Sequence, residues 1–121
     1  MTLHELADPK SLSSFISSNH RSLVCFSATW CGPCRASRPQ LENLASKYAS
    51  DPNTDVSCGL IYEHDLGDAI QSTYGIRAFP TYALYDGSNG GREIGRVQGV
   101  NFDGIRDMND NRNGNWRGSR G

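Results

Sequence analysis

The segment Phe26-Ser27-Ala28-Thr29-Trp30-Cys31-Gly32-Pro33-Cys34-Arg35 holds two cysteines separated by two residues. It overlaps the end of an apolar run at residues 23–26, and consecutive apolar residues are typical of a strand buried on both faces. From Cys34 onward, apolar residues recur at helical spacing. The cysteine pair is therefore expected at the point where a buried strand passes into a helix.

This placement favours redox chemistry. Cys31 would lie at a helix N-terminus, where unpaired N–H groups and the helix dipole stabilise a thiolate over a thiol. Cys34 follows one helical turn later and is positioned to attack a mixed disulfide formed on Cys31. Pro33 restricts the turn, and Gly32 lets a partner's backbone approach closely.

The rest of the chain predicts an α/β architecture. Asp8-Pro9 is a helix start, followed by apolar residues at helical spacing. Residues 56–62 are the next strand candidate, so a strand, a helix continuing through Pro39, and a second strand form a parallel βαβ unit. A short helix is expected over residues 68–74.

The last part of the sequence predicts a hairpin and a helix. Residues 81–85 and 93–98 have strand character and are joined by turn residues. Phe102, Ile105 and Met108 are spaced to line one side of a brief terminal helix. The expected fold is a mixed sheet of four or five strands flanked by helices.

Length and composition predict one domain over residues 1–108 and a disordered Arg/Gly/Asn tail over residues 109–121. A formal net charge of −1 gives no electrostatic reason for nucleic acid or an anionic membrane as the main partner. No apolar run approaches the roughly 20 residues that cross a bilayer. Residues 1–20 lack the pattern of a secretory signal, so a cytoplasmic location is expected.

Two motifs together resemble the thioredoxin family over about residues 1–108. The first is the segment quoted above, with Pro39 where the family has a kinking proline, and the second is Tyr74-Gly75-Ile76-Arg77-Ala78-Phe79-Pro80-Thr81. The resemblance implies a thioredoxin fold with a cis Phe79–Pro80 bond and Pro80 packed beside the cysteines. It assigns Phe79 and Gly99 to a substrate groove and implies that Trp30 flanks the thiols and influences docking.

The resemblance also implies a function. Such a chain is a protein-disulfide reductase in which Cys31 is the nucleophile and Cys34 the resolving cysteine. A thioredoxin reductase that uses NADPH would restore the dithiol, so the chain itself is expected to bind no cofactor and no metal. Its partners would be protein disulfides and that reductase, and the family resemblance favours a monomer.

One feature departs from the family. Many thioredoxins carry a buried Asp where this chain has Cys25, and bacterial members pair it with a Lys at the position matched here by Ile61. Cys34 would then lack an internal base, unless Glu63 or Asp65 comes close. We therefore expect the resolving step to depend on water or on the substrate and to be slower than in relatives with the Asp.

Alternative interpretations remain open at this stage. The missing Asp, the short last helix and the polar tail favour a thioredoxin-like adaptor domain of a larger protein. An oxidase or isomerase shares the fold, but Gly32-Pro33 resembles the reducing branch of the superfamily. A lone Cys-x-x-Cys is also half of a zinc site, although Cys25 and Cys58 lack the close spacing of a second half. Those two cysteines are better explained as small buried hydrophobic residues.

Overall fold

A five-stranded sheet in the order β1-β3-β2-β4-β5 organises the computed structural model, which describes residues 2–110. Strands β1, β3 and β2 run parallel, β4 is antiparallel to β2, and β5 is antiparallel to β4. The predicted fold class, parallel pair and hairpin are therefore confirmed. The strands are β1 (Leu3–Glu5), β2 (Arg21–Ser27), β3 (Val56–Tyr62), β4 (Thr81–Asp86) and β5 (Arg92–Gln98).

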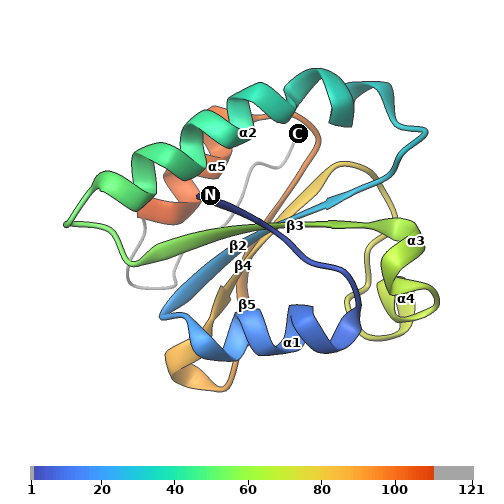
Figure 1. Ribbon diagram of the computed structural model, residues 1–121, viewed down its shortest axis with the longest axis horizontal. Helices are drawn as coiled ribbons and strands as arrows, with labels where there is room; N and C mark the ends of the chain where they lie inside the picture. Colours follow the sequence, from blue (N-terminus) through green and yellow to red (C-terminus); the bar gives the residue numbers. More distant parts are fainter. Residues whose placement is uncertain (1, 111–121) are drawn as a thin grey trace.

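Helices cover both faces of this sheet. Figure 1 shows α2 and α5 above the strands, with α1 below them and α3 and α4 beside α1. Among residues 2–110, no helix is long and apolar enough to cross a membrane. The helices are α1 (Pro9–Ser18), α2 (Gly32–Ser50), α3 (Glu63–Leu66), α4 (Ala69–Ser72) and α5 (Phe102–Asp110), and a single 3₁₀ turn, η1, spans Gly87–Asn89.

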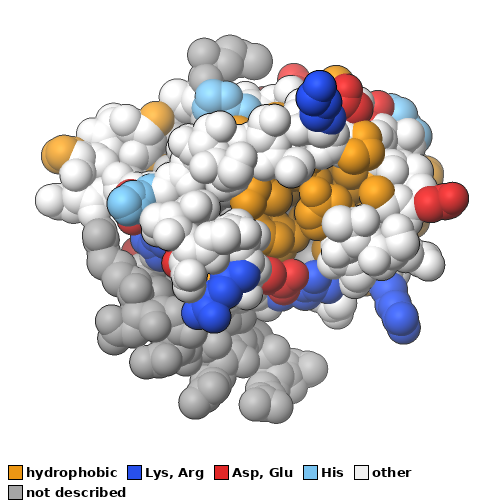
Figure 2. Space-filling view, turned by 90° about the horizontal axis from the view of Figure 1, so that it is seen from below, with side chains coloured by type: hydrophobic (Ala, Val, Ile, Leu, Met, Phe, Trp, Pro, Cys, Tyr) orange, Lys and Arg blue, Asp and Glu red, His pale blue; other side chains and the backbone are white. Residues whose placement is uncertain are grey.

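The central strand β2 contributes to a hydrophobic core on each side of the sheet. Leu23 and Cys25 belong to the cluster packed under α2 and α5, whereas Val24 and Phe26 belong to the cluster packed under α1. This alternation explains the consecutive apolar residues of β2, because both of its faces are covered. Viewed from the α1 side, hydrophobic side chains also reach the surface in the middle of that face (Figure 2).

The sequence signal for the start of α1 is confirmed. The Asp8 carboxylate accepts a hydrogen bond of 2.7 Å from the Ser11 N–H, and the Ser11 hydroxyl accepts one from the Asp8 N–H. Together these bonds form a capping box, with Pro9 at the first helical position. The long helix α2 likewise continues through Pro39, as expected.

Three elements differ from the prediction. The edge strand β1 was not expected, since only three residues form it and only Leu3 is buried. The one-turn helix α3 precedes the expected short helix.

Helix α5 runs past Met108 to Asp110 because Asn109 is buried and donates a hydrogen bond of 3.0 Å to the Tyr48 hydroxyl. The remainder of the predicted tail, residues 111–121, lies outside the described residues.

Gly87 offers a test of how α1 packs against the β4–β5 connection. A Cβ atom at this position would overlap the backbone carbonyl oxygens of Ile16 and Asn19 at the end of α1. Gly87→Ala is therefore expected to lower the free energy of unfolding by about 2–3 kcal/mol, because backbone atoms must shift. Denaturant titration measures this change. The control is Asn89→Ala in the same exposed turn, with an expected change of about 0.5 kcal/mol or less. Equal midpoints for Gly87→Ala and the wild type would contradict the packing.

Candidate functional site

The cysteine pair lies at the N-terminus of α2. Cys31 and Cys34 form a disulfide, and their Cα atoms are 5.3 Å apart. Cys31 is the N-cap residue of the helix, and its Sγ atom accepts a hydrogen bond of 3.2 Å from the Cys34 N–H. The same donor would stabilise a Cys31 thiolate after reduction, since an N–H bound to the charged form lowers a thiol pKa. The geometry thus suits thiol–disulfide exchange.

The loop before β4 meets this pair. The Phe79–Pro80 bond is cis, as expected, and the Phe79 carbonyl oxygen lies 3.7 Å from Cys31 Sγ. Pro80 is buried, and its carbonyl accepts a hydrogen bond of 2.8 Å from the Gly99 N–H. Phe79 also packs against the small cluster that contains both cysteines. Segments near residues 31, 79 and 99 are therefore brought together around one disulfide.

Two large hydrophobic side chains in the described part of the chain are exposed, and both belong to segments of this region. Trp30 is 67% exposed and Val100, next to Gly99, is 44% exposed. The Trp30 indole N–H donates a hydrogen bond of 2.8 Å to the Glu63 carboxylate, and its ring lies edge-on to Phe79 at 5.7 Å. Exposed apolar side chains beside a reactive disulfide are suited to contact a partner protein.

Sequence reasoning considered Glu63 only as a possible base near Cys34, not as a partner of Trp30, and it did not identify Val100 as part of this site. Glu63 directly follows β3, and β2 and β3 are parallel, so the residues after both strands meet at the same edge of the sheet. The parallel pairing was the signal that could have placed Glu63 near Trp30. Val100 gives no comparable signal, because its neighbourhood depends on the hydrogen bond between Gly99 and Pro80.

A cavity of about 260 Å³ lies behind the disulfide, toward the interior. Cys25 contributes to it from β2, where its register partners are Leu60 on β3 and Tyr82 on β4.

The expectation that Ile61 neighbours Cys25 is wrong, because Ile61 packs on the opposite face of the sheet. Neither Glu63 nor Asp65 lines the cavity. The residues that line it are Cys25, Ser27, Cys34, Arg35, Arg38, Leu41, Leu60, Tyr62 and Tyr82.

The two remaining cysteines are buried and free. Burial raises the pKa of Cys25 to about 12, although a hydrogen bond with Tyr82 and the charge of Arg38 act in the opposite direction. Burial also raises the pKa of Cys58 to about 12. At neutral pH both are uncharged thiols, so their interpretation as small buried residues is confirmed. Within residues 2–110, no group of three or more His, Cys, Asp or Glu side chains is arranged to hold a metal ion.

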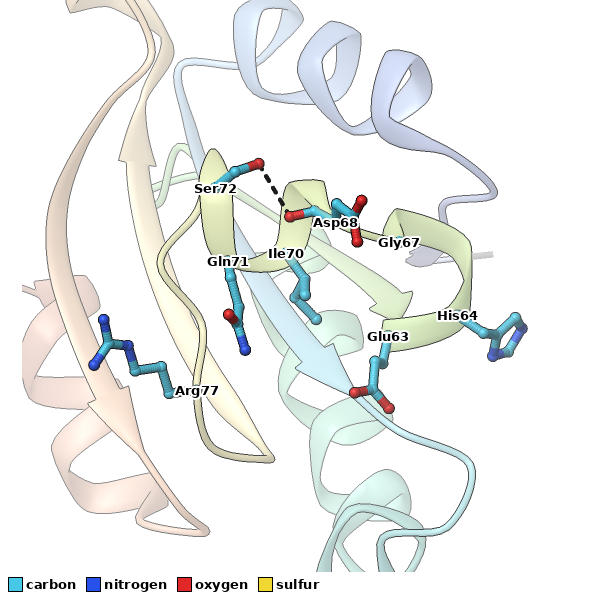
Figure 3. Close-up of a pocket in the computed structure, with 8 residues that line it drawn as sticks. All are labelled: Glu63, His64, Gly67, Asp68, Ile70, Gln71, Ser72 and Arg77. Carbon is cyan, nitrogen blue, oxygen red and sulfur yellow. Dashed lines mark hydrogen bonds between the residues drawn. The ribbon is translucent and has the colours of Figure 1, made fainter.

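A larger hollow of about 870 Å³ lies on the other side of Glu63. Figure 3 shows Glu63 and His64 from α3, Gln71 and Ser72 from α4, and Arg77 from the following loop around it. Its lining is mostly polar and contains no cysteine. Glu63 thus belongs to this hollow and also contacts Trp30 beside the disulfide. The hollow itself is a separate space from the disulfide.

Comparisons with known proteins point in one direction. Residues 4–109 match the family model described as Thioredoxin. The chain is 32% identical to thioredoxin-2 of Pyricularia oryzae over 101 residues. This aligned segment covers 84% of this chain and 54% of that protein. The chain spans about half the length of the first curated relatives it matches.

Solved structures agree with this match. Schistosoma mansoni thioredoxin is 29% identical with a TM-score of 0.74, over 88% of this chain and 92% of that one. Another chain, 25% identical with a TM-score of 0.73 over 88% of this chain and 92% of that one, belongs to a study of thiol resolution in yeast mitochondrial 1-Cys peroxiredoxin via glutathione/thioredoxin systems.

Cys25→Asp tests the character of the cavity. Burial would raise the pKa of the new carboxyl, because the charged form is poorly solvated there. The variant is therefore more stable at low pH, where the carboxyl is protonated, and loses stability as the pH rises through the raised pKa. We expect the variant to be less stable than the wild type by about 3 kcal/mol at about pH 7 and by less at about pH 5. Denaturant titration at both pH values checks this, with Cys25→Ser as the uncharged control. An unchanged midpoint, or a deficit equal at both pH values, would contradict the expectation.

Proposed function

Because the chain belongs to the thioredoxin family, we propose that it is a protein-disulfide reductase, a dithiol–disulfide oxidoreductase acting through Cys31 and Cys34. One observation carries the proposal. Cys31 caps α2 with its sulfur on the Cys34 N–H, within reach of the loop that contains the cis proline. This geometry supports Cys31 as a stabilised nucleophile and Cys34, one helical turn away, as the resolving thiol.

The reaction proceeds in two exchanges. The Cys31 thiolate attacks one sulfur of a substrate disulfide, so a Cys31–substrate disulfide forms and the other substrate sulfur leaves as a thiolate. The Cys34 thiolate then attacks Cys31 Sγ, which forms the Cys31–Cys34 disulfide and releases the second substrate sulfur. The substrate gains two electrons and the cysteine pair loses two.

The surrounding residues support docking and geometry. Within residues 2–110, apart from its chain neighbours and the backbone of its own helix, no atom lies within 4 Å of the position that a Cβ of Gly32 would occupy, so a partner's backbone has room to approach there. Pro33 stands in the first turn of α2 and preorganises it. Trp30, Phe79 and Gly99 would line the groove in which the substrate segment lies, and Pro80 would fix the backbone of Phe79 beside Cys31.

The proposed partners are protein disulfides and a thioredoxin reductase that supplies electrons from NADPH, with no cofactor bound to this chain. A peroxiredoxin is one candidate substrate, since the study of the related yeast system names such a protein. A dithiol of this kind is kept reduced in a reducing compartment, which is the basis for proposing a cytoplasmic location. We propose that the chain acts as a monomer.

Reduction of insulin by dithiothreitol, with the protein as catalyst, tests the disulfide reductase activity. The wild type is expected to accelerate insulin precipitation, and Cys31→Ser is expected to lose this effect because the nucleophile is gone. Cys34→Ser should accumulate a mixed disulfide on Cys31, detectable by mass spectrometry. Cys58→Ser is the matched control and should keep the activity, because Cys58 is buried away from the disulfide. A wild type no faster than dithiothreitol alone would reject the proposal.

Recycling separates the reductase from the alternative of an adaptor domain. If this chain is a disulfide reductase, a mixture of the chain, NADPH and a thioredoxin reductase is expected to consume NADPH in step with insulin reduction. The adaptor alternative is favoured by the neutral Cys25 thiol in the cavity behind the disulfide. It predicts disulfide exchange with dithiothreitol but no NADPH consumption.

A further inference from the structure

The resolving cysteine faces a cavity that carries positive charge and no carboxylate among the residues that line it. Cys34 shares this space with two arginines of α2, Arg35 and Arg38, and with the neutral Cys25 thiol. The other groups with exchangeable protons are the Ser27, Tyr62 and Tyr82 hydroxyls, and burial raises the pKa of Tyr82 well above its ordinary value. No group in the lining can act as a general base at neutral pH, so a different device is needed to favour the Cys34 thiolate.

Arg38 is held at this cavity by three partners from three elements. Its guanidinium lies 3.1 Å from the Glu5 carboxylate on β1 and 3.2 Å from the Glu42 carboxylate on α2. It also donates a hydrogen bond of 2.9 Å to the Tyr62 hydroxyl on β3. A guanidinium fixed in this way keeps both its charge and its position.

Arg38 and Cys34 both line this cavity, and their spacing along α2 explains why. The two residues are four apart, so their side chains lie on the same face of the helix. The charge of Arg38 also reaches a second sulfur of the cavity, since it lowers the pKa of Cys25, although less than burial raises it. Arg35 differs, since it is exposed and donates a hydrogen bond of 2.7 Å to the Thr29 carbonyl.

We propose that Arg38 is a positioning residue for the second exchange step, in which its fixed positive charge at the cavity favours the thiolate form of Cys34. This role rests on the proposed disulfide reductase function and replaces general-base assistance with electrostatic stabilisation. The Cys34 proton passes to water, and the thiolate attacks Cys31 Sγ. The bond between Cys31 and the substrate breaks, and the departing substrate thiolate takes a proton from water.

Reaction of the reduced protein with dithiobis(nitrobenzoate) resolves the two steps. Attack by Cys31 releases the first nitrothiobenzoate, and attack by Cys34 on the resulting mixed disulfide releases the second. For Arg38→Gln we expect the second release to slow about tenfold near neutral pH, with its pH profile shifted upward by about one unit. Arg38→Lys should restore most of the rate, because it restores the charge.

Two further variants separate a charge effect from a structural one. Glu5→Gln breaks one ion pair of Arg38 but removes a negative charge, so the second release should be as fast as in the wild type or faster. Arg35→Gln should slow it by about threefold at most, because an exposed charge acts weakly. Circular dichroism would verify that each variant is folded.

The outcomes are distinct. A wild type that releases no nitrothiobenzoate from Cys31 would overturn the proposed function, and the role of Arg38 with it. A wild type that releases two equivalents, alongside an Arg38→Gln variant with an unchanged pH profile, would overturn the role of Arg38 alone. If the second release slows equally in Glu5→Gln and Arg38→Gln, the effect comes from the ion-pair network and not from the charge of Arg38, which contradicts the proposal. If it slows as much in Arg35→Gln as in Arg38→Gln, the effect is not specific to Arg38, which also contradicts it.

Discussion

The hydrogen bond from the Cys34 N–H to Cys31 Sγ is the interaction on which the site depends. It makes a sulfur atom the cap of a long helix, so the group that begins α2 is also the group that performs the chemistry. In the oxidised protein this donor faces a neutral sulfur, whereas after reduction it faces a developing thiolate. The helix terminus therefore stabilises the reduced, reactive form more than the oxidised one.

The sheet supplies the surroundings of this cap. Strand β2 lies between parallel β3 and antiparallel β4, so the residue after β3 and the residues before β4 meet at the edge where β2 ends. Glu63 reaches Trp30 in this way, and the Phe79 carbonyl reaches Cys31. The same register places Cys25 between Leu60 and Tyr82, in an interior that favours neutral groups. The exposed Trp30 and the buried Cys25 thus both lie near one disulfide.

Much of this arrangement follows from the sequence, and the exceptions have physical reasons. The apolar run of β2, the Asp8-Pro9 cap and the Cys31–Cys34 spacing are local signals, and each was sufficient to predict its element. Strand β1 escaped prediction because pairing with β3, rather than its own three residues, makes it a strand. Ile61 was misplaced because a shift of one residue along a strand moves a side chain to the other face. The Arg38 contacts join three elements, and no local pattern encodes them.

The reduction potential of the Cys31–Cys34 pair measures how far the helix start stabilises the reduced dithiol. Because stabilising the thiolate makes a cysteine pair more oxidising, a disulfide reductase requires that this stabilisation stay modest. Equilibration of the protein in thiol–disulfide buffers of defined ratio, followed by trapping of the free thiols, gives this potential. We expect a value close to the one known for thioredoxin, about −270 mV. A value near about −180 mV or above, in the range of isomerases and oxidases, would contradict it.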